Sequence, residues 1–380
     1  MKLQFLSALY ERHGPVASVY LDTSRDVDDP DRAVELRWRS LRESLLAHGA
    51  DPATVEAAGR ALGTDAPVSG PHGQAVFAAE GELLLAACLP EPPVHASARY
   101  GVVPDALPFA LQHAPDLAYT ALVIHRTHTM DTGNAEDELE VERESGRWPM
   151  SRVAAGRTPS RRIPVDGWAQ EAEQLLAEFA EQVEARGTEV IVLAGDPWAA
   201  NTLTREAPRH LHDRFVRLRD GHPRRPQPGR ALLEAELRSL LAGKVPEHDR
   251  QRLDAFHAQR ARRQEEVEGL AATVTALQRG QARALLVNRR ARLPDRLWAG
   301  AEPTHLALSG AELTAFGVGY YWEEEPGAAL IRAAYGTQAE LLVVEPEEVS
   351  LEDGLGVLLR YVDTDARADG AGRKEEPWPG

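Results

Sequence analysis

The stretch "WAQEAEQLLAEFAEQVEARGTEVIVLAGDPW", residues 168–198, decides the fold class. Apolar residues recur in its first part at steps of three and four, which predicts one helix over 168–186. We expect Asp166 to cap the start of this helix and Gly187 to close its end. "EVIVLAGD" is typical of a buried strand, and Asp196 followed by proline predicts the next helix start. Helix, buried strand and helix in succession indicate an α/β fold.

The same alternation continues on both sides of this stretch. Upstream, "PVASVYLD" predicts a strand and "GQAVFAAEGELLLAACL" predicts a hairpin that turns at Glu80 and Gly81. Downstream, the strands "ARALLVN" and "AELLVVE" enclose a helix, "GAALIRAAYG". The sequence therefore predicts three consecutive α/β domains, with residues 246–279 helical across the second boundary. The expected boundaries are 1–115 for the N-terminal domain, 116–260 for the central domain, 261–366 for the C-terminal domain and 367–380 for a disordered tail.

Composition excludes several classes of protein. The formal net charge of −16 over 380 residues argues against general coating of nucleic acid, although local basic patches remain compatible with it. No apolar run reaches membrane-spanning length, so we expect no membrane partner. The single cysteine, Cys88, excludes an internal disulfide framework, and we expect a buried thiol and a cytoplasmic protein.

No cofactor or metal is expected. "GVGYYW" lacks the spacing of a dinucleotide loop, and no Walker sequence is present. His210, His212 and His257 have arginine neighbours that would repel a cation. Acidic pairs such as Glu171/Glu173 and the run 323–325 are interpreted as solvated faces and not as catalytic carboxylates.

The segment "RVAAGRTPSRRIPVDGW", residues 152–168, is basic in an acidic chain. It holds four arginines before its first acid, whereas "AEDELEVERE" just upstream holds six carboxylates. Two other clusters are basic: residues 205–230, which include the Pro/Arg segment "GHPRRPQPGR", and "RARR" at 260–263. Arginines on loops suit irregular RNA, whose phosphates accept charge and whose unpaired bases accept stacking. We expect RNA contacts from Arg152, Gly156, Arg157, Arg161, Arg162, Arg224 and Arg225.

The order of these segments resembles the class-one peptide release factors of eukaryotes and archaea and their relative Pelota. Residues 154–183 and 189–203 follow the plan of that family's central domain, in which a strand, a mobile Gly-Gly-Gln loop and a long helix succeed one another. "VTALQRGQARALLVN" and "GLGVLLRY" resemble its C-terminal domain. Together with "GPVASVYLDTSRD", they look like the bacterial branch, which contains Balon-type and mycobacterial stress-induced ribosome hibernation factors. The resemblance covers about residues 1–365.

The chain departs from the release factors at the catalytic loop. The matching position reads Ala155-Gly156-Arg157, with no glutamine between residues 152 and 169. An arginine carries only donors and does not orient a hydrolytic water as an amide does. The resemblance therefore implies a loop at 152–165 that replaces Gly-Gly-Gln and binds RNA without hydrolysing peptidyl-tRNA.

The resemblance implies a monomeric ribosome hibernation or stress factor that occupies the vacant A site of the 70S ribosome. Its first domain would face the decoding centre and its third would face the stalk base or elongation factor Tu. One alternative is a ribosome-rescue enzyme that cleaves peptidyl-tRNA or tRNA, with Arg157, Arg161 and Arg162 stabilising phosphate charge. A second alternative is an α/β binding scaffold unrelated to translation.

Overall fold

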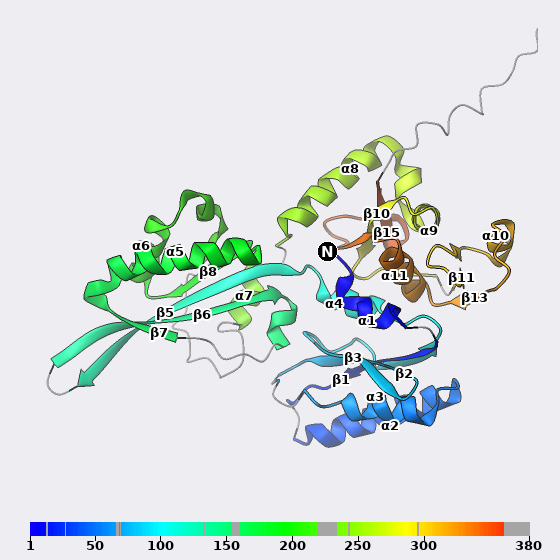
Figure 1. Ribbon diagram of the computed structural model, residues 1–380, viewed down its shortest axis with the longest axis horizontal. Coiled ribbons are helices and arrows are strands. Elements are labelled where there is room, and N and C mark those ends of the chain that lie inside the picture. Colours follow the sequence, from blue (N-terminus) through cyan, green and yellow to red (C-terminus); the bar gives the residue numbers. More distant parts are fainter. Residues whose placement is uncertain are drawn as a thin grey trace, which may run out of the picture.

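The structure is a computed structural model in which three units follow one another along the chain (Figure 1). The described residues are 1–12, 14–26, 28–65, 68, 70–131, 134–153, 160–218, 234–241, 244–294 and 296–360. Within these ranges, only the backbone is described for residues 128–131, 134–136, 152–153, 234–236 and 263–265.

The N-terminal unit is an antiparallel sheet in the order β3-β2-β1-β4 with two helices on one face. β1 is buried on both faces, because Ala17, Val19 and Leu21 pack under these helices while Val16 and Tyr20 face the other side. The hairpin predicted at Glu80 is confirmed, since Glu80 and Gly81 both have positive φ angles. Its elements are η1 (Gln4–Leu6), α1 (Ser7–Tyr10), β1 (Val16–Asp22), α2 (Pro30–Ala47), α3 (Pro52–Ala61), β2 (Gly73–Ala79), β3 (Glu82–Leu89), β4 (Ser97–Gly101) and α4 (Leu107–His113).

The central unit is a mixed sheet in the order β7-β6-β5-β8-β9. β5 pairs with β6 as a long hairpin that projects past the rest of the sheet (Figure 1), whereas β8 runs parallel to both β5 and β9. Helices α5 and α6 cover one face, and α7 packs on the other. Its elements are β5 (Leu117–Asp131), β6 (Asn134–Trp148), η2 (Met150–Val153), β7 (Ser160–Pro164), η3 (Val165–Gly167), α5 (Trp168–Arg186), β8 (Val190–Gly195), α6 (Pro197–Glu206), η4 (Arg209–Arg214), β9 (Phe215–Arg217) and α7 (Glu234–Leu241).

The C-terminal unit contains two small sheets, β14-β10-β15 and β12-β11-β13. The segment 246–279 is helical as predicted, but it breaks into two helices at Gly269, whose φ is +87°. Its elements are α8 (Glu247–Val267), α9 (Gly269–Gln278), β10 (Ala282–Asn288), β11 (Leu297–Gly300), β12 (Leu306–Ala307), α10 (Gly310–Ala315), β13 (Tyr321–Glu324), α11 (Pro326–Gly336), β14 (Glu340–Val344), η5 (Glu352–Gly354) and β15 (Leu355–Leu359).

The predicted α/β fold is confirmed by these sheets and helices. The expected domain boundaries stay predictions, and the one at residue 260 falls inside α8. The prediction that Asp166 caps α5 is wrong, because Asp166 lies in the short turn η3 and the capping position is Gly167, without a side-chain cap. The predicted closure by Gly187 is confirmed by its left-handed conformation. No helix in the described ranges is long and apolar enough to span a membrane.

The N-terminal and C-terminal units share one apolar core. Tyr20, Phe77 and Phe109 from the first belong to the same buried cluster as Leu285 and Leu330 from the second. Polar contacts accompany this packing, because Arg289 donates to the carbonyl oxygens of Leu111 and Ala114. The N-terminal and C-terminal units are therefore packed together through one common core, whereas the central unit has cores of its own.

A group of carboxylates lies at the contact between these two units. Arg99 of β4 forms an ion pair with Glu324, which is only 3% exposed. Glu325 next to it accepts a hydrogen bond of 2.5 Å from the Ala328 N–H and so caps α11. Burial, with the added charge of Glu325, raises the pKa of Asp105 to about 7. This carboxyl group therefore keeps its proton far above the range of an exposed aspartate.

We expect Asp105 to make stability depend on pH. The folded pKa of about 7 exceeds the usual value of 3.8, so the contribution to folding is fully present below 3.8 and is lost as the pH rises through 7. The decrease in the free energy of unfolding is roughly 4 kcal/mol at most, at about 1.4 kcal/mol per pKa unit. Asp105→Asn should therefore unfold at higher urea than the parent at pH 8 and should flatten the pH dependence. The control is Asp254→Asn at an exposed site on α8. Equal pH profiles for the parent and Asp105→Asn would contradict a raised pKa.

Candidate nucleic-acid interface

The residues that the sequence suggests as RNA contacts are only partly described. Gly156, Arg157, Arg224 and Arg225 lie outside the described residues. The backbone of Arg152 forms part of η2, and its side chain lies outside the description. Arg161 and Arg162 are both placed, so the geometry of the basic segment is known where it joins α5.

The expectation of a loop across residues 152–165 is wrong for its second half. Residues 160–164 form the edge strand β7, which pairs with β6 so that Arg161 faces Val141 and Arg162 faces Glu140. Arg161 donates to Glu171 of α5 at 2.6 Å, and the Arg162 Nε lies 4.0 Å from a Glu140 carboxylate oxygen. Both guanidinium groups thus meet carboxylates of their own unit.

The acidic segment upstream of the basic one is the strand β6. Its acids alternate with apolar residues, so Leu139 and Val141 are buried against α5 and α6 while the glutamates project from the opposite face. Tyr119 of β5 donates to Glu144 at 3.0 Å. β6 therefore supplies both an apolar face for the core and carboxylates beside Arg162.

The carboxyl edge of the parallel strands is shaped by Gly195. This residue ends β8 with a φ of +94°, and a Cβ built on it would lie 2.0 Å from the carbonyl oxygen of Ile124. Only glycine allows so close an approach of β8 to β5. The Asp196 N–H then donates to the same Ile124 oxygen at 2.8 Å, which turns the chain directly into α6.

Arg126 and Trp198 meet at this edge. The guanidinium of Arg126 lies 5.7 Å from the centre of the Trp198 ring, whose side chain is 48% exposed. Arg126 Nε also donates to Asp196 at 2.9 Å. Burial opposes ionisation of Asp196, but the Ala199 N–H and Arg126 together hold its pKa below the usual range. Asp196 therefore fixes both the start of α6 and the position of Arg126.

The exposed side of α6 extends this edge into a strip, which we define as Arg126, Trp198, Asn201, Arg205 and Arg217. Arg217 ends β9 and donates to Asn201 at 2.5 Å and to Thr204 at 3.1 Å. Both acceptors are neutral, so these contacts position the charge of Arg217 without neutralising it. An exposed indole between guanidinium groups can stack on an unpaired base while the cations contact phosphates.

The sequence that follows β9 is also basic. Residues 219–233 lie outside the described ranges, but their sequence holds four arginines and one aspartate. The other basic segments are partly satisfied within the chain: Arg214 lies 3.2 Å from Glu184, and Arg260 lies 2.8 Å from Glu268. Carboxylates of the same chain thus reduce the charge of several predicted basic positions.

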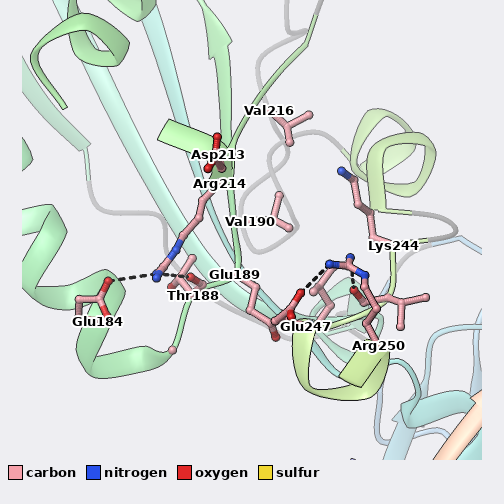
Figure 2. Close-up of a pocket in the computed structure, with 13 residues that line it drawn as sticks. Glu184, Thr188, Glu189, Val190, Asp213, Arg214, Val216, Lys244, Glu247 and Arg250 are labelled. Carbon is pink, nitrogen blue, oxygen red and sulfur yellow. Dashed lines mark hydrogen bonds and ion pairs between the residues drawn. The ribbon is translucent and has the colours of Figure 1, made fainter. Parts of the chain in front are cut away.

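A pocket of about 440 Å³ lies where the central unit meets α8 (Figure 2). On one side, Arg214 reaches the Thr188 carbonyl at 3.0 Å. On the other, Glu189 accepts a 2.6 Å hydrogen bond from the N–H of Glu247, the first residue of α8. Acidic and basic groups alternate around the pocket, and the bond to Glu189 attaches α8 to the central sheet.

One further expectation about side chains is tested by the structure. The interpretation of residues 323–325 as a solvated face is wrong for Glu324, which is buried, and for Glu325, which caps α11, whereas Glu323 is exposed. Among the described residues, no group of three or more metal-ligating side chains converges. His210 lies 3.7 Å from Glu184, and His212 contacts the Ala207 carbonyl.

The sequence does not by itself single out Arg126 or Trp198. A partial signal is present, since Asp196 and Pro197 indicate a helix start after a buried strand. Ligands of open α/β sheets bind at the carboxyl ends of parallel strands. The parallel pairing of β5 with β8, which brings Arg126 beside Trp198, is a long-range contact that the local pattern does not contain.

Several solved structures resemble this chain, whereas a search of curated proteins gave no match. The archaeal translation termination factor aRF1 is similar at 14% identity over 94% of this chain and 96% of that chain, with a TM-score of 0.20. Archaeoglobus fulgidus Pelota is similar at 11% identity, over 77% of this chain and 80% of that chain, with a TM-score of 0.33. Dom34 of S. cerevisiae, a translation termination-like factor, is similar at 11% identity, over 77% and 81%, with a TM-score of 0.34.

A family match in the central unit is more informative than these structural likenesses, whose TM-scores below 0.5 say nothing about function. The sequence profile of bacterial archaeo-eukaryotic release factor family 2 matches residues 121–262. That range contains most of the β5–β6 hairpin, the basic segment, the strip and the pocket beside α8. Over residues 121–262, the chain is similar to the bacterial archaeo-eukaryotic release factor family 2.

Proposed function

We propose that this protein is a ribosome-associated hibernation or stress factor that occupies the vacant A site by binding ribosomal RNA. The observation that carries the proposal is the family match over residues 121–262, because the same range holds the exposed strip and the basic segment. In this proposal the central unit contacts RNA of the large subunit. Elongation factor Tu is a proposed partner, and the protein acts as a monomer in the cytoplasm.

The surface chemistry of the central unit supports contact with RNA at defined places. The net charge of −16 repels phosphates over much of the surface, so binding depends on locally exposed arginines and on stacking. Trp198 supplies an exposed ring for stacking, and Arg217 supplies an exposed guanidinium group. Arg161 is exposed enough to exchange its partner Glu171 for a phosphate, since exposed ion pairs contribute only about 0–1 kcal/mol.

The sequence of the basic segment supports binding without hydrolysis. Ala155-Gly156-Arg157 stands where the resemblance places Gly-Gly-Gln, and no amide side chain lies in the segment 152–169. An arginine there attracts phosphate but provides no amide to position a water molecule. A ribosome-rescue enzyme is the competing function, and it is distinguished by the fate of the substrate.

The first prediction concerns the basic segment. Arg157→Ala combined with Arg161→Ala and Arg162→Ala should weaken co-sedimentation with vacant 70S ribosomes. It should also reduce the slope of log affinity against log salt by about 0.7–0.9 for each phosphate that the variant no longer neutralises. The matched variant Glu171→Gln removes the partner of Arg161 and should tighten binding or leave it unchanged. Unaltered binding and an unaltered slope in the triple variant would exclude the basic segment as an RNA contact.

The second prediction separates stacking from charge within the strip. Trp198→Ala should weaken ribosome binding about tenfold with little change in salt slope, because one stacked base contributes about 1–3 kcal/mol. Arg217→Gln should instead lower the slope by about 0.7–0.9, the value for one phosphate. Arg186→Gln, an exposed arginine at the far end of α5, is the control in the same unit. Parental affinity in both strip variants would show that this strip faces away from RNA.

The third prediction concerns chemistry. When the protein is added to ribosomes that carry labelled peptidyl-tRNA, we expect the ester bond and the tRNA to stay intact. Acid precipitation measures the ester bond, and gel analysis measures the tRNA. Release of peptide above the rate in buffer would support a rescue enzyme. If the triple arginine variant still bound ribosomes but no longer released peptide, the activity would be assigned to the basic segment.

A further inference from the structure

A groove of about 520 Å³ separates the two helices that form the outer layer of the N-terminal unit. Helices α2 and α3 cover the face of the sheet that points away from the C-terminal unit (Figure 1). The groove is lined from α2 by Trp38, Arg42 and Leu46, and from α3 by residues that include Glu56 and Arg60. Neither the central strip nor the basic segment contributes to it.

Trp38 forms the wall of this groove because α3 carries a glycine opposite it. A Cβ built on Gly59 would lie 2.9 Å from Trp38 Nε1 and 3.2 Å from its Cε2. Glycine inside a helix costs about 1 kcal/mol relative to alanine. Its presence at this position lets the indole lie directly against α3, half-buried, with the rest of the ring bordering the groove.

Two cations border the same groove without partners in the part of the chain that the structure describes. Arg42 lies one turn along α2 from Trp38, and Arg60 follows Gly59 on α3; both are exposed, and neither forms an ion pair or hydrogen bond with a described residue. Other arginines of this unit are engaged, such as Arg37 with Asp22 at 3.3 Å. Positive charge at the groove is therefore available to a ligand.

We propose that this groove binds an unpaired nucleotide of single-stranded RNA. The base would stack on Trp38 and contact Leu46, while Arg42 and Arg60 would bind the phosphates on its two sides. Glu56, the acid of the lining, accepts hydrogen bonds and so favours bases with an exocyclic amine over uracil. Two unpaired guanidinium groups on opposite walls suit a phosphodiester better than a neutral peptide.

This inference rests on the proposed function, since a ribosome-bound protein meets unpaired RNA, and it gives the N-terminal unit a contact of its own. The groove site and the proposed function can nevertheless be tested separately. The groove is tested with short RNA, in the absence of ribosomes, whereas the proposed function is tested with vacant ribosomes.

The experiment measures anisotropy of fluorescein-labelled A7, C7 and U7 RNA with the full-length protein. The parent should bind A7 and C7 more tightly than U7. Trp38→Leu, which keeps an apolar side chain against α3, should weaken A7 binding about tenfold because one base is no longer stacked. Arg42→Gln with Arg60→Gln should lower the salt slope by about 1.4, at about 0.7 for each phosphate of a single strand.

The control is Arg39→Gln, an exposed arginine of α2 that is 4.0 Å from Glu35 and outside the groove lining. It should bind RNA as the parent does. Equal A7 affinity in the parent, Trp38→Leu and the double arginine variant would overturn the groove site, even if ribosome binding persists. Displacement of A7 by hexaglutamate at equal concentration would also overturn it, in favour of an acidic peptide. Weakened A7 binding only in the groove variants would support it, whatever the ribosome assay shows.

Discussion

The arrangement of the central unit depends on the burial of β8 on both faces. Ile191 and Leu193 pack under α5 and α6, while Val192 and Ala194 face α7. A strand buried in this way must pair its backbone on both edges, because unpaired amide groups are costly away from water. β5 and β9 provide those partners. The close approach of β8 to β5 at Gly195 then sets where α6 starts, and with it the position of the strip.

An acidic protein can carry a site for RNA when its carboxylates hold arginines in place without burying them. Glu171 and Asp196 do this for Arg161 and Arg126, and a neutral amide does it for the arginine that ends β9. Exposed pairs of this kind exchange partners at little free-energy cost. For the proposed RNA contact, fixed geometry with low net attraction favours a defined site over general adhesion to nucleic acid.

Local patterns are sufficient for much of the fold. The predicted helix over 168–186 and the strand after it are confirmed, because their apolar spacing matches the period of each element. The edge strand at 160–164 is not among the predicted elements. In the acidic run upstream, Leu139 and Val141 alternate with glutamates, but the charge of the run obscures this pattern. The partner of Arg161 is Glu171 on α5, and the partner of Arg162 is Glu140 on β6. Such pairings are set by the tertiary fold, which composition and periodicity do not specify.

The core shared by the first and third units fixes an order of events during synthesis. Tyr20, Phe77 and Phe109 leave the ribosome long before Leu285 and Leu330, against which they are buried. The central unit, which has its own cores, can complete its folding in that interval. The N-terminal unit can form its own cluster under α2 and α3 early, but its other apolar face stays open until the last third of the chain arrives.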